Sequence, residues 1–210
     1  MLFASVGYWE DANNIWYGGS NRNIGWGQIN RLDNPLANWQ EDFFLGSSYL
    51  RPEVLKQIIF TKDPSGNALS SPDTVLICAG YSSNFVTRSV IVKSFVRNDA
   101  NGSWGESQIV QGSFPAGENY SIRDIEIHVD QQTGLEYVFA TVGTQGIYKG
   151  KYNASNPGKI DWISTAEFGP LDIRPLGIEV ANGALHFLSG SKLYRRIDGI
   201  SPNYAIDHDF

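Results

Sequence analysis

The sequence predicts an all-β fold, and three observations carry that prediction. The 210 residues include 22 glycines, and aromatic residues make up 13%, a composition typical of many short strands joined by tight turns. One unit built of apolar strands recurs four times along the chain. No segment keeps a helical apolar period, so no helix is expected. We therefore expect a β-propeller of four-stranded antiparallel blades, with about four blades here, as part of a larger propeller.

Each unit begins with a short apolar strand that ends in glycine. These strands are expected at residues 2–7, 75–80, 138–143 and 186–190. A second strand is expected after each of them, at residues 14–17, 89–92, 146–149 and 192–195. A third strand begins in each unit with an aromatic residue, namely Trp39, Trp104, Trp162 and Tyr204. The side chains of Phe139, Tyr148 and Trp162 are expected to lie in the core.

A leading strand connects one unit to the next, and three copies are expected, at residues 50–61, 122–129 and 173–180. The last of them runs into Asn182-Gly183, a strong hairpin signal. The blade units then span about 1–48, 49–113, 114–168 and 169–210 of a single partial domain, residues 1–210. A closed ring would need one more leading strand. We expect it from further blades of a longer chain, with a very small imperfect ring or a strand from a partner chain as the alternatives.

Charge and composition exclude several classes of protein. The net charge is −6 and the pI about 5.0, and the longest basic cluster is Arg195-Arg196 beside Lys192. Proteins that bind nucleic acid or anionic membranes need a basic face, so neither partner is expected. Cys78 is the single cysteine, which excludes an internal disulfide. No apolar stretch is long enough to span a membrane and no signal peptide is visible, so we expect a soluble protein of unknown compartment.

One segment resembles the blades of known propeller families. Residues 174–187, which contain P-L-G-I-E-V, and the strand at 192–196 resemble the blades of NHL-type and SMP-30-like propellers. The whole chain also resembles the propeller part of large uncharacterised microbial proteins. The resemblance implies a propeller fold; NHL propellers mostly bind proteins or RNA, and SMP-30-like propellers include metal-dependent lactonases. The functional residues of neither family can be placed in this sequence.

An arginine stands at the head of each leading strand, at Arg51, Arg123 and Arg174. In a propeller this strand is innermost, and one of its ends surrounds the mouth of the axial channel. Three guanidinium groups around that mouth would form an anion site suited to carboxylate or phosphate. The alternative is structural: each arginine bonds loop carbonyls or a carboxylate of a neighbouring blade.

The second leading strand carries three further candidates. Strand periodicity places Asp124, Glu126 and His128 on one face. Two carboxylates and an imidazole could help to bind a divalent metal, or could supply a general base with its orienting partner. No cofactor is otherwise predicted. The alternative is a hydrogen-bond network between blades, with Glu126 or Asp124 bound to an arginine of the repeat.

An aromatic-rich insertion follows the first strand. It spans residues 8–26, and its loop carries Trp9 beside Tyr8, Glu10 and Asp11. Exposed tryptophan next to acidic and amide side chains is a common way to stack on a sugar ring and bind its hydroxyls. Trp9 is therefore a candidate for carbohydrate contact.

Three functions follow from these candidates. The first is a binding module whose channel mouth holds a small anionic or sugar ligand, or a partner protein. The second is a metal-assisted hydrolase or lyase with its site on the channel axis. The third is a structural or interaction propeller within a larger protein. The fold alone does not choose among them, because propellers serve all three purposes.

Overall fold

The computed structural model describes strands and connections over much of the chain. Its backbone is described at residues 2–7, 9–10, 16–17, 27–32, 40–44, 50–82, 90–96, 108–110, 122–156 and 158–210. Side chains are described at residues 54, 56–75, 77, 122–156 and 158–210. Within these residues the protein is all-β: it consists of antiparallel strands and one short 3₁₀ turn, Gly143–Gln145. No helix of the described part is long and apolar enough to cross a membrane.

Three four-stranded sheets form the body of the molecule, and in each the strands lie in chain order. The first contains β6 (Leu50–Lys62), β7 (Ala68–Ser82), β8 (Val90–Val96) and β9 (Gln108–Val110). The second contains β10 (Ile122–Val129), β11 (Glu136–Val142), β12 (Gly146–Tyr152) and β13 (Ile160–Trp162). The third contains β14 (Gly177–Ala181), β15 (Ala184–Ser189), β16 (Lys192–Ile197) and β17 (Asn203–Asp209). The predicted four-stranded antiparallel units are thus confirmed for these three sheets.

The N-terminal unit differs from its prediction. β1 (Leu2–Gly7) pairs with β4 (Gly27–Leu32), and β4 pairs with β5 (Gln40–Phe44). The strand expected at residues 14–17 is instead part of a separate hairpin, in which β3 (Trp16–Tyr17) pairs with β2 (Trp9–Glu10). The prediction that residues 14–17 form the second strand of this unit is therefore wrong. The apolar pattern of Gly27–Leu32 is weaker than that of residues 14–17, but Gly27–Leu32 is the segment that pairs with β1.

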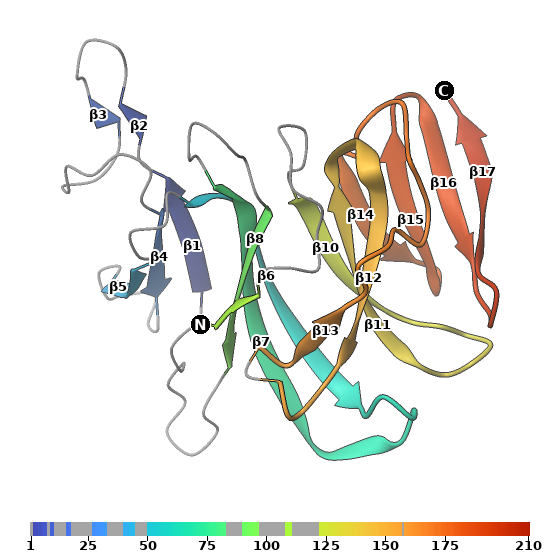
Figure 1. Ribbon diagram of the computed structural model, residues 1–210, viewed down its shortest axis with the longest axis horizontal. Helices are drawn as coiled ribbons and strands as arrows, with labels where there is room; N and C mark the ends of the chain where they lie inside the picture. Colours follow the sequence, from blue (N-terminus) through green and yellow to red (C-terminus); the bar gives the residue numbers. More distant parts are fainter. Residues whose placement is uncertain are drawn as a thin grey trace.

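The three four-stranded sheets follow one another in space, as Figure 1 shows. Their first strands are neighbours, because β10 contacts both β6 and β14. Within the described residues the row of sheets is open, and no sheet closes on itself. The sheet β10–β13 lies between the other two and is therefore covered on both faces.

Two apolar cores fill the spaces between these sheets. One joins the sheets β6–β9 and β10–β13, and contains Phe60, Ile125 and Trp162. The other joins the sheets β10–β13 and β14–β17, and contains Phe139 and Phe187. Every residue of β11 is buried, since this strand contributes to both cores. The predicted burial of Phe139, Tyr148 and Trp162 is confirmed.

The turn at Asn182-Gly183 is the predicted tight hairpin. Ala181 pairs with Ala184 across it, so the loop has two residues, and both have positive φ angles, 52° and 76°. Positive φ at both positions is the signature of a type I′ turn, whose twist matches that of the flanking strands. This turn lies at the end of β14 and β15 that is opposite to the start of β14.

The connection between β13 and β14 is held against the turn between β11 and β12. Ile147 donates its backbone N–H to Phe168 O at 2.8 Å, and Leu171 donates to Thr144 O at 2.8 Å. The approach is so close that a Cβ atom at Gly169 would lie 2.1 Å from the Gln145 carbonyl oxygen. Gly169 also has φ +146°, so glycine is required there. These contacts fix the path of residues 168–173, which form one wall of a pocket.

Candidate functional site

A pocket of about 300 Å³ opens at one end of the sheet β14–β17. Its walls come from residues 168–173 on one side and residues 189–194, at the turn between β15 and β16, on the other. Gly177, at the start of β14, pairs with Leu188, near the end of β15. The pocket therefore lies at the end of the sheet where β14 begins, and, within the described residues, none of those predicted from the sequence to bind a ligand lines it.

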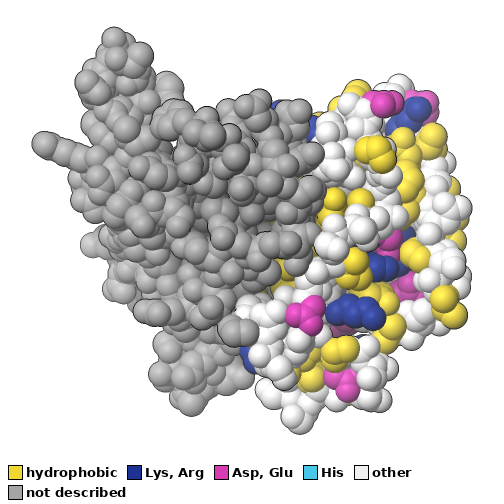
Figure 2. All heavy atoms as spheres, in the orientation of Figure 1, with side chains coloured by type: hydrophobic (Ala, Val, Ile, Leu, Met, Phe, Trp, Pro, Cys, Tyr) yellow, Lys and Arg dark blue, Asp and Glu magenta, His cyan; other side chains and the backbone are white. Residues whose placement is uncertain are grey.

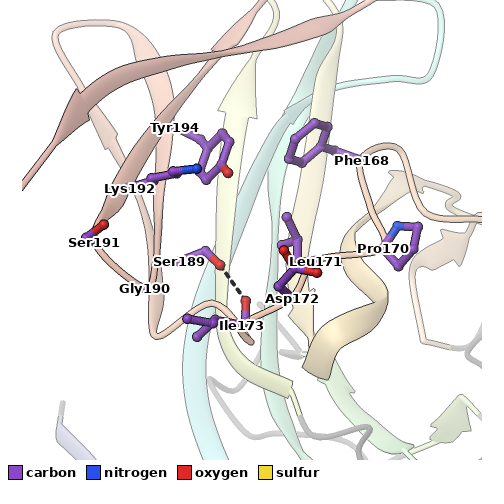
Figure 3. A pocket seen from close by; sticks show the side chains of 10 residues that line it. All are labelled: Phe168, Pro170, Leu171, Asp172, Ile173, Ser189, Gly190, Ser191, Lys192 and Tyr194. Carbon is purple, nitrogen blue, oxygen red and sulfur yellow. Dashed lines mark hydrogen bonds between the residues drawn. The ribbon is translucent and has the colours of Figure 1, made fainter.

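The floor of the pocket is set by local hydrogen bonding. The Ser189 hydroxyl donates to the carbonyl oxygen of Ile173, as the dashed line in Figure 3 shows. Leu176 N donates to Leu188 O at 3.0 Å and holds the same connection against β15. Gly190 has φ +61°, and a Cβ there would lie 2.9 Å from Ile173 Cδ1. These contacts tie the two walls of the pocket together.

Aromatic rings make one side of the pocket rigid. The rings of Phe168 and Tyr194 both line the cavity and pack against each other, with their centres 5.5 Å apart (Figure 3). Each is supported from behind, because Phe168 stacks on Tyr204 at 4.5 Å and Tyr194 stacks on Phe187 at 4.8 Å. Rings packed in this way give a ligand a flat apolar surface at little entropic cost.

The polar lining contains one ammonium and one carboxylate group. Lys192 projects from β16 and Asp172 from the opposite wall (Figure 3). In the part of the chain that the structure describes, neither side chain forms an ion pair. Ser191 donates its hydroxyl proton to Asp209 Oδ1 at 2.7 Å, so its oxygen offers lone pairs to the pocket.

The three repeated arginines are in different surroundings. Arg51 lies in β6, and its side chain is outside the described residues. Arg123 lies within β10, is half-buried and has an interaction partner. Arg174 is exposed and precedes β14, which begins at Gly177 and not at residue 173 as predicted.

Asp124, Glu126 and His128 each bond to a different group. The Asp124 carboxylate accepts from Ile178 N at 3.0 Å, which joins β10 to β14. Glu126 Oε2 accepts from Lys56 Nζ of β6 at 2.7 Å. His128 Nε2 lies 2.9 Å from both carboxylate oxygens of Asp198. The structure thus directs these three groups to partners on neighbouring sheets, and none of these partners is an arginine of the repeat.

Lys56, on β6, lies close to acidic side chains of β10 and β14. Burial acts to lower the pKa of Lys56, but the hydrogen bond to Glu126 and the negative charges of Glu126, Asp124 and Glu179 outweigh burial, so its pKa is raised. Among the described residues, no group of three or more His, Cys, Asp or Glu side chains is arranged to hold a metal ion. Trp9 lies in β2, and its side chain is outside the described residues, so its contact with sugar stays a prediction.

Sequence reasoning missed a buried ionic cluster between the sheets β10–β13 and β14–β17. Its centre is Arg196, which is 2% exposed. The Arg196 guanidinium binds Glu167 through two nitrogens, at 2.9 and 3.1 Å, and Asp130 through Nη1 at 2.9 Å. The same Nη1 also donates to Asp198, the partner of His128. We define these five residues, Arg196, Glu167, Asp130, Asp198 and His128, as the Arg196 cluster.

The electrostatics of the Arg196 cluster follow from this pairing. Burial raises the pKa of Glu167, but hydrogen bonds from Arg196, Lys149 and Tyr204 more than offset it, and the net pKa is lowered. For Asp130, bonds from Thr133 N–H, Arg196 and Gly199 N–H likewise outweigh burial and hold its pKa well below the usual range. The only sign of this cluster in the sequence is Arg196 itself, because it stands in a strand at a position where the alternation of apolar and polar residues predicts a side chain that points inward.

The surface of the described part carries mixed charge. On the face shown in Figure 2, Lys and Arg side chains are interspersed with Asp and Glu and with apolar groups.

Comparison with known proteins gives no further guide to identity. No protein-family model matches the chain, and no curated protein matches it in sequence.

Proposed function

We propose that this chain is part of a β-propeller and acts as a binding module for a small ligand. The ligand site lies at the end of the sheets where their first strands begin. Three meanders in chain order, joined through β6, β10 and β14, support the propeller architecture. The resemblance of residues 174–187 to NHL-type and SMP-30-like blades points the same way. A larger ring would supply further blades beyond the described sheets.

The pocket beside Lys192 is the single observation that carries the binding function. It has the volume of a small ligand site, about 300 Å³, and it is lined by packed aromatic rings with a few polar groups. Lys192 has no ion-pair partner among the described residues, and the exposed Arg174 at the same end has none either. The Lys192 ammonium group at the cavity favours a ligand that carries a negatively charged group, and Asp172 leaves room for a positive one.

The contacts of Glu126 and His128 argue against the second candidate function, a metal-assisted hydrolase or lyase. Glu126 and His128, the residues assigned to it, are bonded to Lys56 and Asp198. A general base or a metal ligand needs a lone pair that faces substrate or metal. The pairing of these two residues instead favours a structural role between sheets.

The binding function can be tested on the whole chain by two-dimensional NMR. Isotope-labelled protein is titrated with a mixture of small carboxylates, amino acids and sugars. We expect at least one compound to shift the amide signals of residues 171–173 and 189–192 in a saturable manner. The Lys192→Met variant should weaken that binding, whereas Lys151→Met, on β12 outside the pocket, should leave it unchanged. Shifts confined to other residues would contradict the proposed site.

A further inference from the structure

The two charged groups of the pocket have no partner of their own among the described residues. Lys192 and Asp172 line the same cavity from opposite walls, and no ion pair joins them to each other. The half-buried Lys192 and the exposed Asp172 offer both signs of charge to a ligand in the cavity. A ligand with a single charge satisfies one of these groups and leaves the other without a counter-charge.

The hydroxyl groups add a directional pattern to these charges. Ser189 and Ser191 both use their protons on protein acceptors, Ile173 O and Asp209 Oδ1. Their oxygens can therefore only accept hydrogen bonds from a ligand. Asp172, on the opposite wall, is a further acceptor, so the pocket favours a ligand with a group rich in N–H or O–H donors. An ammonium group carries three such donors.

The remaining lining is apolar. Phe168, Leu171, Ile173 and Tyr194 contribute rings and aliphatic groups to the cavity. An uncharged hydrocarbon group of a ligand gains from contact with such walls, because it leaves water. The pocket thus combines one cation, several hydrogen-bond acceptors and apolar side chains within a volume of about 300 Å³.

We infer that the pocket binds a free amino acid with an apolar side chain. Its carboxylate would meet Lys192, its ammonium group would meet Asp172, and its side chain would lie against Phe168 and Tyr194. This inference rests on the proposed binding function and names the class of its ligand. The opposite charges of Lys192 and Asp172 match both ends of a zwitterion, whereas a sugar acid or a dicarboxylate offers no positive charge to Asp172.

The test uses leucine and two analogues that each lack one charge. Leucinamide lacks the carboxylate, and N-acetylleucine lacks the ammonium group. Titrations of the full chain, followed by the amide signals of residues 171–173 and 189–192, should show leucine binding at least ~10-fold more tightly than either analogue, since each loses one charge-assisted contact. Glucuronate serves as the sugar-acid probe and should bind more weakly than leucine.

Two variants assign the charges to the two ends of the ligand. Lys192→Met should weaken the binding of leucine by ~10-fold and leave the affinity for leucinamide unchanged. Asp172→Asn should weaken the binding of leucine and leave the affinity for N-acetylleucine unchanged. If either analogue or glucuronate binds as tightly as leucine, the amino-acid inference is wrong but the pocket remains a ligand site. If none of the compounds, nor any of the mixture used above, shifts the pocket amides, the proposed function fails with it.

Discussion

At the residue scale, the most heavily engaged side chain of the described part is Arg196. A buried guanidinium is tolerated only when its charge is paired, because desolvation of an isolated charge is costly. Here Glu167, Asp130 and Asp198 supply that pairing, and the side chain also lies 5.2 Å from the centre of the Phe139 ring. The Arg196 cluster therefore connects β16 to the sheet β10–β13 through charge as well as through apolar packing.

Removal of this arginine should be severely destabilising. The Arg196→Met variant keeps much of the volume but removes the cation shared by three acidic side chains, of which, among the described residues, only Glu167 retains a lysine partner, Lys149. We expect a loss of about 3–5 kcal/mol in the free energy of unfolding. The neighbouring Arg195 provides a matched control, because it is exposed and has a single 3.3 Å contact to Asp207. Arg195→Met should cost less than about 1 kcal/mol. Urea denaturation measures both, and equal losses would argue against a special role for Arg196.

The same cluster predicts how stability depends on pH. The pKa of Glu167 is lowered in the folded protein from an ordinary value of 4.5. A group with a depressed pKa stabilises the fold above its unfolded pKa, and this contribution is lost as the pH falls through the folded pKa. Stability should therefore fall on acidification below about pH 4.5, and it should fall less steeply in Glu167→Gln. Parallel pH profiles of the two proteins would exclude Glu167 as a source of this acid sensitivity.

At the element scale, the connection between β13 and β14 determines whether the pocket exists. Residues 168–173 belong to no named strand, and they keep their path through bonds to Ile147 and Thr144. If the pocket binds a ligand as proposed, binding should depend on the packing of this connection. A change that moves the connection should remove the pocket even when it leaves every lining side chain intact.

Gly169→Ala tests that dependence. The new methyl group would meet the Gln145 carbonyl at 2.1 Å, and the φ angle of +146° is unfavourable for alanine. Gly183→Ala is a suitable control, because Gly183 also has positive φ but nothing within 4 Å of the added atom. We expect Gly169→Ala to cost at least about 1 kcal/mol more than Gly183→Ala in urea denaturation. Gly169→Ala alone should also abolish the ligand-induced NMR shifts.

The strands themselves are largely predictable from the sequence, because each depends mainly on the pattern of apolar residues within it. Alternating or continuous apolar runs that end in glycine are sufficient to locate β7, β11 and β15. The prediction places the start of β14 too early, at residue 173, whereas the strand begins at Gly177. It also favours the aromatic β3 over the weakly apolar β4, although pairing depends on the partner strand as well as on propensity.

The sites are less predictable because they depend on contacts between distant residues. Arg196 meets Asp130 across 66 positions of sequence, and nothing in either local pattern indicates the other. The pocket likewise forms where the connection between β13 and β14 meets the turn between β15 and β16. The repeated arginines are a pattern visible in the sequence, but Arg123 and Arg174 occupy different positions relative to their strands.

At the scale of the whole molecule, the described sheets form a series in which each inner sheet supports its neighbours. The sheet β10–β13 takes part in both cores, whereas β17 lies at the outer edge of the last sheet. Proteins built in this way owe their stability to the interfaces between adjacent units. Local opening should therefore be easiest at strands that have fewest neighbours.

Amide hydrogen exchange should show this gradient directly. We expect the slowest exchange in β11, which is buried throughout, and faster exchange in β17, where most side chains are exposed. Mass spectrometry of peptides from each strand gives the comparison. Uniform exchange across the three sheets would instead indicate that the molecule opens only as a single cooperative unit.

The hairpin turn at Asn182-Gly183 has a practical consequence. It is exposed, its glycine has open space around it, and it lies at the end of β14 and β15 remote from the pocket. Exposed turns of this kind accept inserted residues well. A short affinity tag placed there would fasten the protein to a sensor surface with its pocket directed towards the flowing solution.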